Sequence, residues 1–235
     1  EKTKTVNYSN YWKKKLELLH TKSNETIKKT DIEYGKFLGK KIIRFLKDET
    51  IELIASHGHT IFHQPENNYT LQIGNGSTIA RITQIKTINN FRNLDVSLNG
   101  QGAPLVAIGD LLLFSDYKYC INIGGFANIS IKEKHKIKAF DICPTNIVLN
   151  KLSKRLNLEF DKNGNIAKTG KIIPKLLEEL NNLHFYKTNP PKSLSREWSE
   201  KFVNPLLLQE YKTKDILHTF CEHIAIQIGK YLDNN

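Results

Sequence analysis

The chain has 235 residues, of which 39% are hydrophobic, and its formal net charge is +11. The length allows one large domain or two lobes, and the apolar residues are spread widely enough to bury a core, which excludes a disordered chain. The lysines form one dense run at residues 13–15 and otherwise lie scattered among acidic and apolar residues. Because this scatter is typical of a solvated surface, we expect no nucleic-acid partner.

The cysteines and the hydropathy pattern indicate the compartment. Cys120, Cys143 and Cys221 lie far apart without CxxC spacing, which argues against a disulfide framework and a zinc knuckle and is typical of a reducing cytosol. No apolar run approaches the roughly 18 to 20 residues that span a bilayer, and no charged-then-apolar leader opens the chain. We therefore expect a cytoplasmic protein with no membrane partner; a chain without an initial Met leaves room for a leader upstream.

Two amphipathic helices are predicted first, from Tyr11 to His20 and from Asp31 to Lys47. Short apolar strands that end in polar or glycine-rich loops follow at residues 51–56, 69–73 and 86–90, with a short helix at residues 78–83. This alternation predicts an α/β fold. Ligands gather at strand ends in such folds, so the loops after these strands are candidate binding sites.

The second half of the chain predicts strands and then helices. Strands are expected within residues 120–131 and 137–142, and a helix from Thr145 to Leu156 with Pro144 at its first turn, where a missing N–H costs nothing. A turn is predicted at residues 161–164. Further helices are predicted at residues 172–180, 195–202 and 215–232.

The segment that follows the first strand offers several ligand-binding groups. His57, Gly58, His59 and Thr60 supply two imidazoles, a hydroxyl and a flexible backbone, and His63 follows closely. Three histidines at this spacing are compatible with metal ligands. They lack a carboxylate or cysteine partner nearby, so loop histidines that make hydrogen bonds are the favoured interpretation and no metal site is expected.

Two glycine-rich segments are candidate ligand loops. In the first, Gly100 and Gly102 flank Gln101, whose amide can donate to and accept from sugar hydroxyls; an ordinary turn explains the same composition. In the second, Asn122 precedes Gly124-Gly125, a pair that can expose backbone N–H groups to a phosphate. A plain hairpin turn explains that pair equally well.

Asp141 lies at a strand end ahead of a predicted helix. A carboxylate there can act as a general base if it faces a cleft. It can also cap the helix, which is the commonest role of Asp in this position and is slightly favoured by the residues alone.

Five segments, taken in order, resemble one family. They are SHGHTIFHQP, TLQIGNGSTIA, NFRNLDVSLNGQGAPL, CINIGGFANIS and AFDICPTN, and the later KSLSREW is also similar. Together they resemble the successive signature blocks of anhydro-N-acetylmuramic acid kinase, and the resemblance covers the chain from about Tyr8 to Leu232.

The resemblance implies a fold and an activity. The expected fold is α/β: a two-lobed, actin-like ATPase (sugar kinase, ribonuclease H-like) fold with an interlobe cleft, incomplete at both ends, with residues 1–116 in the first lobe and 117–235 in the second. The expected reaction uses ATP and Mg²⁺ to hydrolyse the anhydro ring of 1,6-anhydro-N-acetylmuramic acid and phosphorylate O6 during peptidoglycan recycling. A cytoplasmic homodimer with a small amino-sugar substrate is implied, and the fragment alone is expected to be inactive.

The resemblance also assigns residues. Asp141 matches the catalytic aspartate, which would take a proton from the attacking water. Arg92 would serve the substrate or transition-state charge. The remaining matches are His57, Gly58, Thr60, Gly100, Gln101 and Gly102 on the sugar side, and Asn122, Gly124 and Gly125 on the phosphate side.

Departures from the family pattern leave one alternative open. Asn90 stands where Asp is usual, residues 143–145 replace a more glycine-rich run, and the family's first phosphate loop and adenosine block are absent from this sequence. The alternative is a non-catalytic sugar-binding relative, or sensor, that has lost nucleotide binding.

Overall fold

The computed structural model describes residues 2–133, 136–208 and 210–232. Its contacts divide the chain into two compact units, the first ending at Gly102 and the second beginning at Ala103. Both units mix helices with small sheets, so the predicted α/β class is confirmed. The lobes predicted for residues 1–116 and 117–235 stay a prediction.

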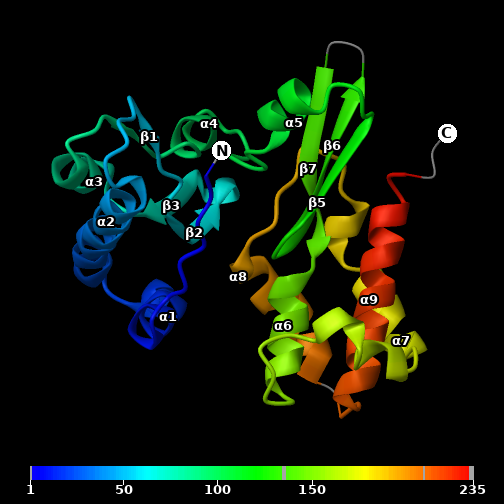
Figure 1. The fold of residues 1–235 in the computed structure, drawn as a ribbon. Helices are drawn as coiled ribbons and strands as arrows, with labels where there is room; N and C mark the ends of the chain where they lie inside the picture. Colours follow the sequence, from blue (N-terminus) through cyan, green and yellow to red (C-terminus); the bar gives the residue numbers. More distant parts are fainter. Residues whose placement is uncertain (1, 134–135, 209, 233–235) are drawn as a thin grey trace. The chain divides into compact units, whose positions relative to one another are not determined.

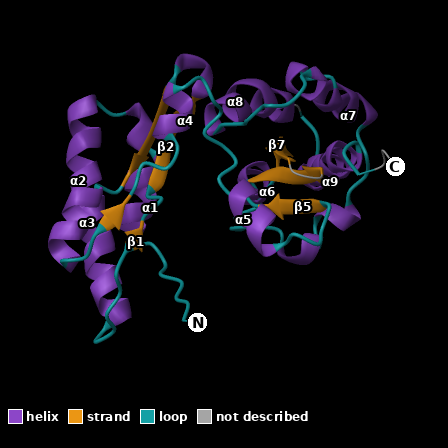
Figure 2. Ribbon diagram, turned by 90° about the horizontal axis from the view of Figure 1, so that it is seen from above, coloured by secondary structure: helices purple, strands orange, loops and turns teal. Residues whose placement is uncertain are grey.

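The first unit is built on a long helix. It contains α1 (Asn10–Glu17), α2 (Asn24–Leu46), α3 (Gly76–Thr83) and α4 (Asn93–Ser97). The Ser23 side chain accepts a hydrogen bond from Thr26 N at 3.3 Å and thereby begins α2. This cap, which the sequence reading did not use, starts the helix seven residues before the predicted Asp31. Figure 2 shows α2 and α3 beside the strands of this unit, and α2 contacts both α3 and β3.

The strands of the first unit form two pairs. β1 (Ile54–Ala55) pairs in parallel with β4 (Thr87–Ile88), and β2 (His59–Gln64) pairs antiparallel with β3 (Tyr69–Ile73). β3 has the predicted bounds, whereas β2 was predicted as a loop. A core closes around Trp12, Tyr34, Ile61 and Ile73. These buried side chains join α1, α2 and the β2–β3 hairpin.

The second unit contains a three-stranded antiparallel sheet in the order β5-β6-β7. The strands are β5 (Tyr119–Ile123), β6 (Phe126–Glu133) and β7 (Lys136–Pro144), preceded by α5 (Ala107–Leu113) and followed by α6 (Asn146–Lys154). β7 is an edge strand of this sheet. Pro144 ends β7 instead of opening α6, so its predicted first-turn position is wrong.

Helices complete the second unit: α7 (Pro174–Asn181), α8 (Arg196–Trp198) and α9 (Thr213–Gly229). A short 3₁₀ turn (His184–Lys187) follows α7, and a π-helix (Ser199–Val203) continues α8. The strands β5, β6 and β7 lie side by side in Figure 1, and α9 packs against β7.

Among the described residues, no helix is both long enough and apolar enough to span a bilayer.

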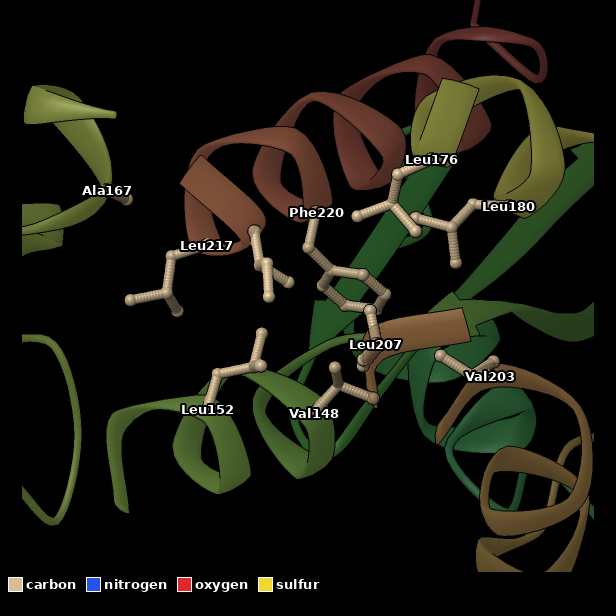
Figure 3. Close-up of a cluster of buried hydrophobic side chains, with 10 residues drawn as sticks. Val148, Leu152, Ala167, Leu176, Leu180, Val203, Leu207, Leu217 and Phe220 are labelled. Carbon is tan, nitrogen blue, oxygen red and sulfur yellow. The ribbon is translucent and has the colours of Figure 1, made fainter. Parts of the chain in front are cut away.

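The main core of the second unit lies between α6, α7 and α9. Figure 3 shows the Phe220 ring at its centre, with Leu176 and Leu180 of α7 on one side and Val148 of α6 on another. Phe220, Leu176 and Leu180 are fully buried. A second cluster, which includes Phe140 and Ile142 of β7, packs against the end of α9. The sheet is therefore held on one face by α9.

Candidate functional site

Arg92 organises a group of polar residues in the first unit, here called the Arg92 cluster (His57, Arg92, Asp95 and Gly102). Arg92 Nε and Nη2 donate to His57 Nε2 at 3.2 and 3.0 Å, and Nη1 donates to Gly102 O at 2.7 Å. The guanidinium thus links the end of β1 to the loop after α4. Two residues far apart in the sequence are held by one planar donor.

The hydrogen bonds define the state of His57. Arginine can only donate, so His57 Nε2 accepts, and Nδ1 carries the proton and donates to Gly58 O at 3.1 Å. Desolvation lowers the pKa of His57; the bond to Gly58 opposes this effect, and the Arg92 charge adds to it. The ring is therefore neutral and exposed, with one nitrogen already used by Arg92.

Gly58 sets the path of the chain between β1 and β2. Its φ is +74°, and a Cβ there would lie 2.2 Å from Ile73 O. Only glycine fits this close approach of backbone to backbone. His57 and Thr60, on either side of this glycine, are both exposed, and Thr60 is already the second residue of β2.

Asp95 holds the loop after α4 by two hydrogen bonds. Asp95 Oδ2 accepts from Gly102 N at 2.6 Å, and Asp95 O accepts from Gly100 N at 2.7 Å. Gly102 has φ +62°, a conformation that favours glycine. Gly100 and Gly102 therefore shape the loop that carries Gln101 between them. Sequence reasoning missed Asp95, although it lies inside the NFRNLDVSLNG segment.

The three histidines of the 57–63 segment do not gather as metal ligands. His63 is buried and bonds through Nδ1 to Thr70 Oγ1 at 3.2 Å, and Gln72 donates to the same hydroxyl at 2.8 Å. Burial, with a smaller effect of Arg92, lowers the pKa of His63 to about 4. Across the described parts of the chain, no group of three or more His, Cys, Asp or Glu side chains is arranged to hold a metal ion.

The glycine pair of the second unit forms the β5–β6 turn. Gly124 O accepts from Thr145 Oγ1 at 2.7 Å and Asn146 Nδ2 at 2.8 Å, and Gly125 O accepts from Thr145 N at 2.9 Å. The turn carbonyls therefore cap the start of α6. A Cβ at Gly125 would meet nothing within 4 Å, so its backbone faces open space. Asn122 is exposed on β5 just before this turn.

Asp141 lies within β7 and not at a helix end. The N-cap position of α6 is Thr145, so the helix-cap interpretation of Asp141 is wrong. Its strand neighbours Phe140 and Ile142 belong to the apolar cluster of the sheet. Its side chain is 6% exposed, and Oδ2 accepts from Leu194 N at 2.7 Å. The carboxylate is thus held by an amide from a segment 53 residues later.

The structure therefore brings the predicted residues into two groups. His57, Gly58, Arg92 and Gly102 meet in the first unit, with Thr60, Gly100 and Gln101 adjacent along the chain. Asp141, the Gly124-Gly125 turn and Asn122 lie on the three-stranded sheet of the second. Sequence reasoning missed the residue pair Lys192 and Leu194, although both lie in the KSLSREW segment.

The signature segments thus place polar and glycine-rich residues in loops and strands of both units. A family profile described as anhydro-N-acetylmuramic acid kinase matches residues 9–234. The chain belongs to the anhydro-N-acetylmuramic acid kinase family. The resemblance predicted from the signature segments is therefore confirmed, and no finding supports the sensor alternative.

Curated relatives agree with this family. An anhydro-N-acetylmuramic acid kinase of Bacillus cereus (strain AH187) is 40% identical over 196 residues, which is 77% of this chain and 51% of the relative. A kinase of the same name from Bacillus thuringiensis (strain Al Hakam) is 38% identical over 187 residues, which is 73% of this chain and 49% of the relative. The chain spans about half the length of the curated relatives it matches.

Proposed function

We propose that the protein acts as an ATP-dependent kinase that opens the 1,6-anhydro ring of 1,6-anhydro-N-acetylmuramic acid and phosphorylates O6, in peptidoglycan recycling. The observation that carries this proposal is Asp141, a carboxylate oriented by the Leu194 N–H inside the AFDICPTN segment of a kinase family. We propose further that the fold is of the actin-like, two-lobed type, and that the enzyme is a cytoplasmic homodimer.

Asp141 is proposed as the general base. It takes a proton from water, the water oxygen bonds to the anomeric carbon, and the bond from that carbon to O6 breaks. O6 would then take the γ-phosphoryl group of ATP as the bond to the bridging oxygen breaks and ADP leaves. Because Asp141 is nearly buried, we expect it to be shielded from bulk water until the sugar and its attacking water are bound. The Leu194 N–H donates to Oδ2 and holds the carboxylate in one orientation.

The Arg92 cluster is proposed to bind the sugar. Arg92 holds the His57 ring and the loop at Gly102 in fixed positions, so Thr60 and Gln101 are offered to the sugar hydroxyls from a preformed surface. A preformed surface loses less conformational entropy on binding than a mobile one. The guanidinium can also neutralise charge on the substrate.

The Gly124-Gly125 turn is proposed to approach the nucleotide phosphates. The open space beside Gly125 allows close approach of a phosphate to the backbone, and Asn122 lies two residues before Gly124. When bound, ATP supplies the phosphoryl group, and Mg²⁺ would be held mainly by its phosphate oxygens. No described side chain is assigned as a Mg²⁺ ligand.

The test is Asp141→Asn in the complete gene product. We expect turnover to be abolished while sugar affinity, measured by isothermal titration, stays within a few fold, because the amide keeps the shape and loses the base. Asp161→Asn is the matched control. The Asp161 carboxylate likewise accepts from backbone N–H groups, those of Ile166 and Ala167 at 2.9 Å, so its variant disturbs a similar structural contact and should keep turnover.

Three results would overturn the proposal. Near wild-type turnover of Asp141→Asn would exclude the general-base role. If the Asp141→Asn variant does not fold while the Asp161→Asn variant does, Asp141 has a structural role and not a catalytic one. Sugar binding without any nucleotide binding by the complete gene product would exclude a kinase.

A further inference from the structure

The edge of β7 is paired at Asp141 by a short segment, residues 192–194, here called the strap. Asp141 N donates to Lys192 O at 3.1 Å, and Leu194 N donates to Asp141 Oδ2 at 2.7 Å. Both the backbone and the carboxylate of Asp141 are therefore bonded to the strap. Any movement of the strap along β7 changes the hydrogen bond to the proposed base.

Lys192 anchors the strap by its side chain. Its Nζ donates to Phe185 O and to Thr188 O, both at 3.0 Å. The same ammonium lies 4.5 Å from the centre of the Phe185 ring and 5.8 Å from that of Tyr231. One buried amine thus joins the 3₁₀ turn after α7 to the strap and to the end of α9.

Burial makes this an unusual position for a lysine. Lys192 is 6% exposed, and lysine is almost never fully buried unless it is paired. Burial lowers the pKa of Lys192 to about 8, and the charge of Lys230 adds to the effect. The desolvation of an ammonium is costly, and two carbonyls and two aromatic rings offset that cost here. A methionine or leucine would fill the same space without the desolvation cost, so the amine indicates a requirement for the hydrogen bonds themselves.

We propose that Lys192 is a positioning residue for the reaction: it clamps the carbonyls of Phe185 and Thr188, fixes the strap, and so holds the Leu194 N–H on the Asp141 carboxylate. The inference rests on the proposed function, since it concerns the base of that reaction. Lys192 acts through the strap, because its hydrogen bonds go to backbone carbonyls of residues 185 and 188.

Burial shifts the pKa values of several groups around this contact away from the range between pH 4 and 7. They come from β7, from the turn after α7 and from the end of α9. Burial raises the pKa of Cys143 to about 12 and also raises the pKa values of Tyr186 and Tyr231, and it lowers the pKa of His223 to about 3. Lys230 and Lys192 carry the positive charges of this region. We therefore assign a fall of kcat toward low pH to the Asp141 carboxylate.

The experiment compares Lys192→Met with Lys132→Met in the complete gene product, with turnover of the anhydro sugar measured from pH 4 to 9. Lys132 is the matched control because its Nζ also clamps two carbonyls, those of Asp110, at 3.0 Å, and Phe114. For Lys192→Met we expect kcat to fall at least tenfold, while the KM for the anhydro sugar and the KM for ATP stay within about twofold of wild type. The acidic limb of kcat should rise by about one pH unit, because a carboxylate that loses a donor protonates more readily.

Each outcome decides a separate question. Wild-type enzyme without turnover would overturn the proposed function and this inference with it. If the wild-type enzyme is active and Lys192→Met has the same kcat and the same acidic limb, only the role of Lys192 is overturned. An equal effect in Lys132→Met would also overturn it, because general loosening of the sheet would then explain the loss. If Lys192→Met does not fold, Lys192→Gln, which keeps N–H donors without the buried charge, is judged by the same criteria.

Discussion

Acidification should destabilise the second unit through one histidine. His223 of α9 is fully buried, and its Nδ1 and Nε2 bond to Asn181 Oδ1 at 2.8 Å and Tyr186 Oη at 3.0 Å. Burial, with a smaller effect of Lys230, lowers the pKa of His223 from 6.5 to about 3. A neutral His223 joins α9 to α7 and to the turn after it. Protonation places a charge in this dry position.

The size and sign of the effect follow from the pKa values of the two states. Below pH 6.5 the unfolded chain binds a proton that the folded chain does not bind until about pH 3, so stability falls as the pH falls through this window. At about 1.4 kcal/mol per pH unit, the loss is about 2 kcal/mol at pH 5 and reaches about 5 kcal/mol near pH 3. Above pH 6.5 His223 contributes no pH dependence.

Urea unfolding at a series of pH values from 8 to 4.5 measures this slope. We expect His223→Gln to lose about 1–3 kcal/mol at pH 8, because buried hydrogen bonds are disturbed, and to show a flatter decline between pH 6.5 and 4.5 than the wild type. His184→Gln, which changes an exposed histidine after α7, is the control and should keep the wild-type slope. A His223→Gln slope equal to that of the wild type would refute the assignment.

Three further predictions follow from the two units. Phe220→Ala should lower the free energy of unfolding by about 3–5 kcal/mol, because the ring is fully buried at the centre of its cluster; denaturant titration measures this loss, and a change below 1 kcal/mol would contradict it. Gly58→Ala should destabilise the first unit by more than about 1 kcal/mol, since a Cβ meets Ile73 O at 2.2 Å and φ is +74°, and a stable variant with an unchanged melting midpoint would disprove the turn. Arg92→Lys in the complete gene product should weaken sugar affinity about tenfold in isothermal titration, because lysine cannot bridge His57 and Gly102 together; unchanged affinity would remove Arg92 from the sugar site.

Much of the secondary structure could be predicted from local patterns. β3 has the predicted bounds Tyr69–Ile73, and the last long helix, predicted from residue 215, begins at Thr213. One error has a local physical reason. β2 was predicted as a loop because Gly58 and the histidines resemble a turn, yet the strand begins at His59, directly after Gly58 with its φ of +74°. The helix predicted at residues 195–202 is present as α8, which continues as a π-helix from Ser199 to Val203.

The candidate site divides in the same way. The residue types that could bind a sugar were evident, because the polar and glycine-rich loops follow apolar strands. The hydrogen bond from Arg92 to His57 could not be predicted from the sequence, since it joins residues 35 positions apart. The role of Asp95 was missed for a related reason: a single carboxylate in a polar segment gives no signal until the loop folds back onto it.

The sequence by itself determined the family, the α/β class and the residues that carry polar chemistry, because these depend on composition and local order along the chain. Only the tertiary structure decided what holds those residues. It placed Asp141 inside a strand edge instead of at a helix end, and brought Leu194 N within 2.7 Å of its carboxylate. It also showed that Lys192 is buried at 6% exposure. Local sequence cannot specify such contacts, because they form only when segments distant along the chain pack together and exclude water.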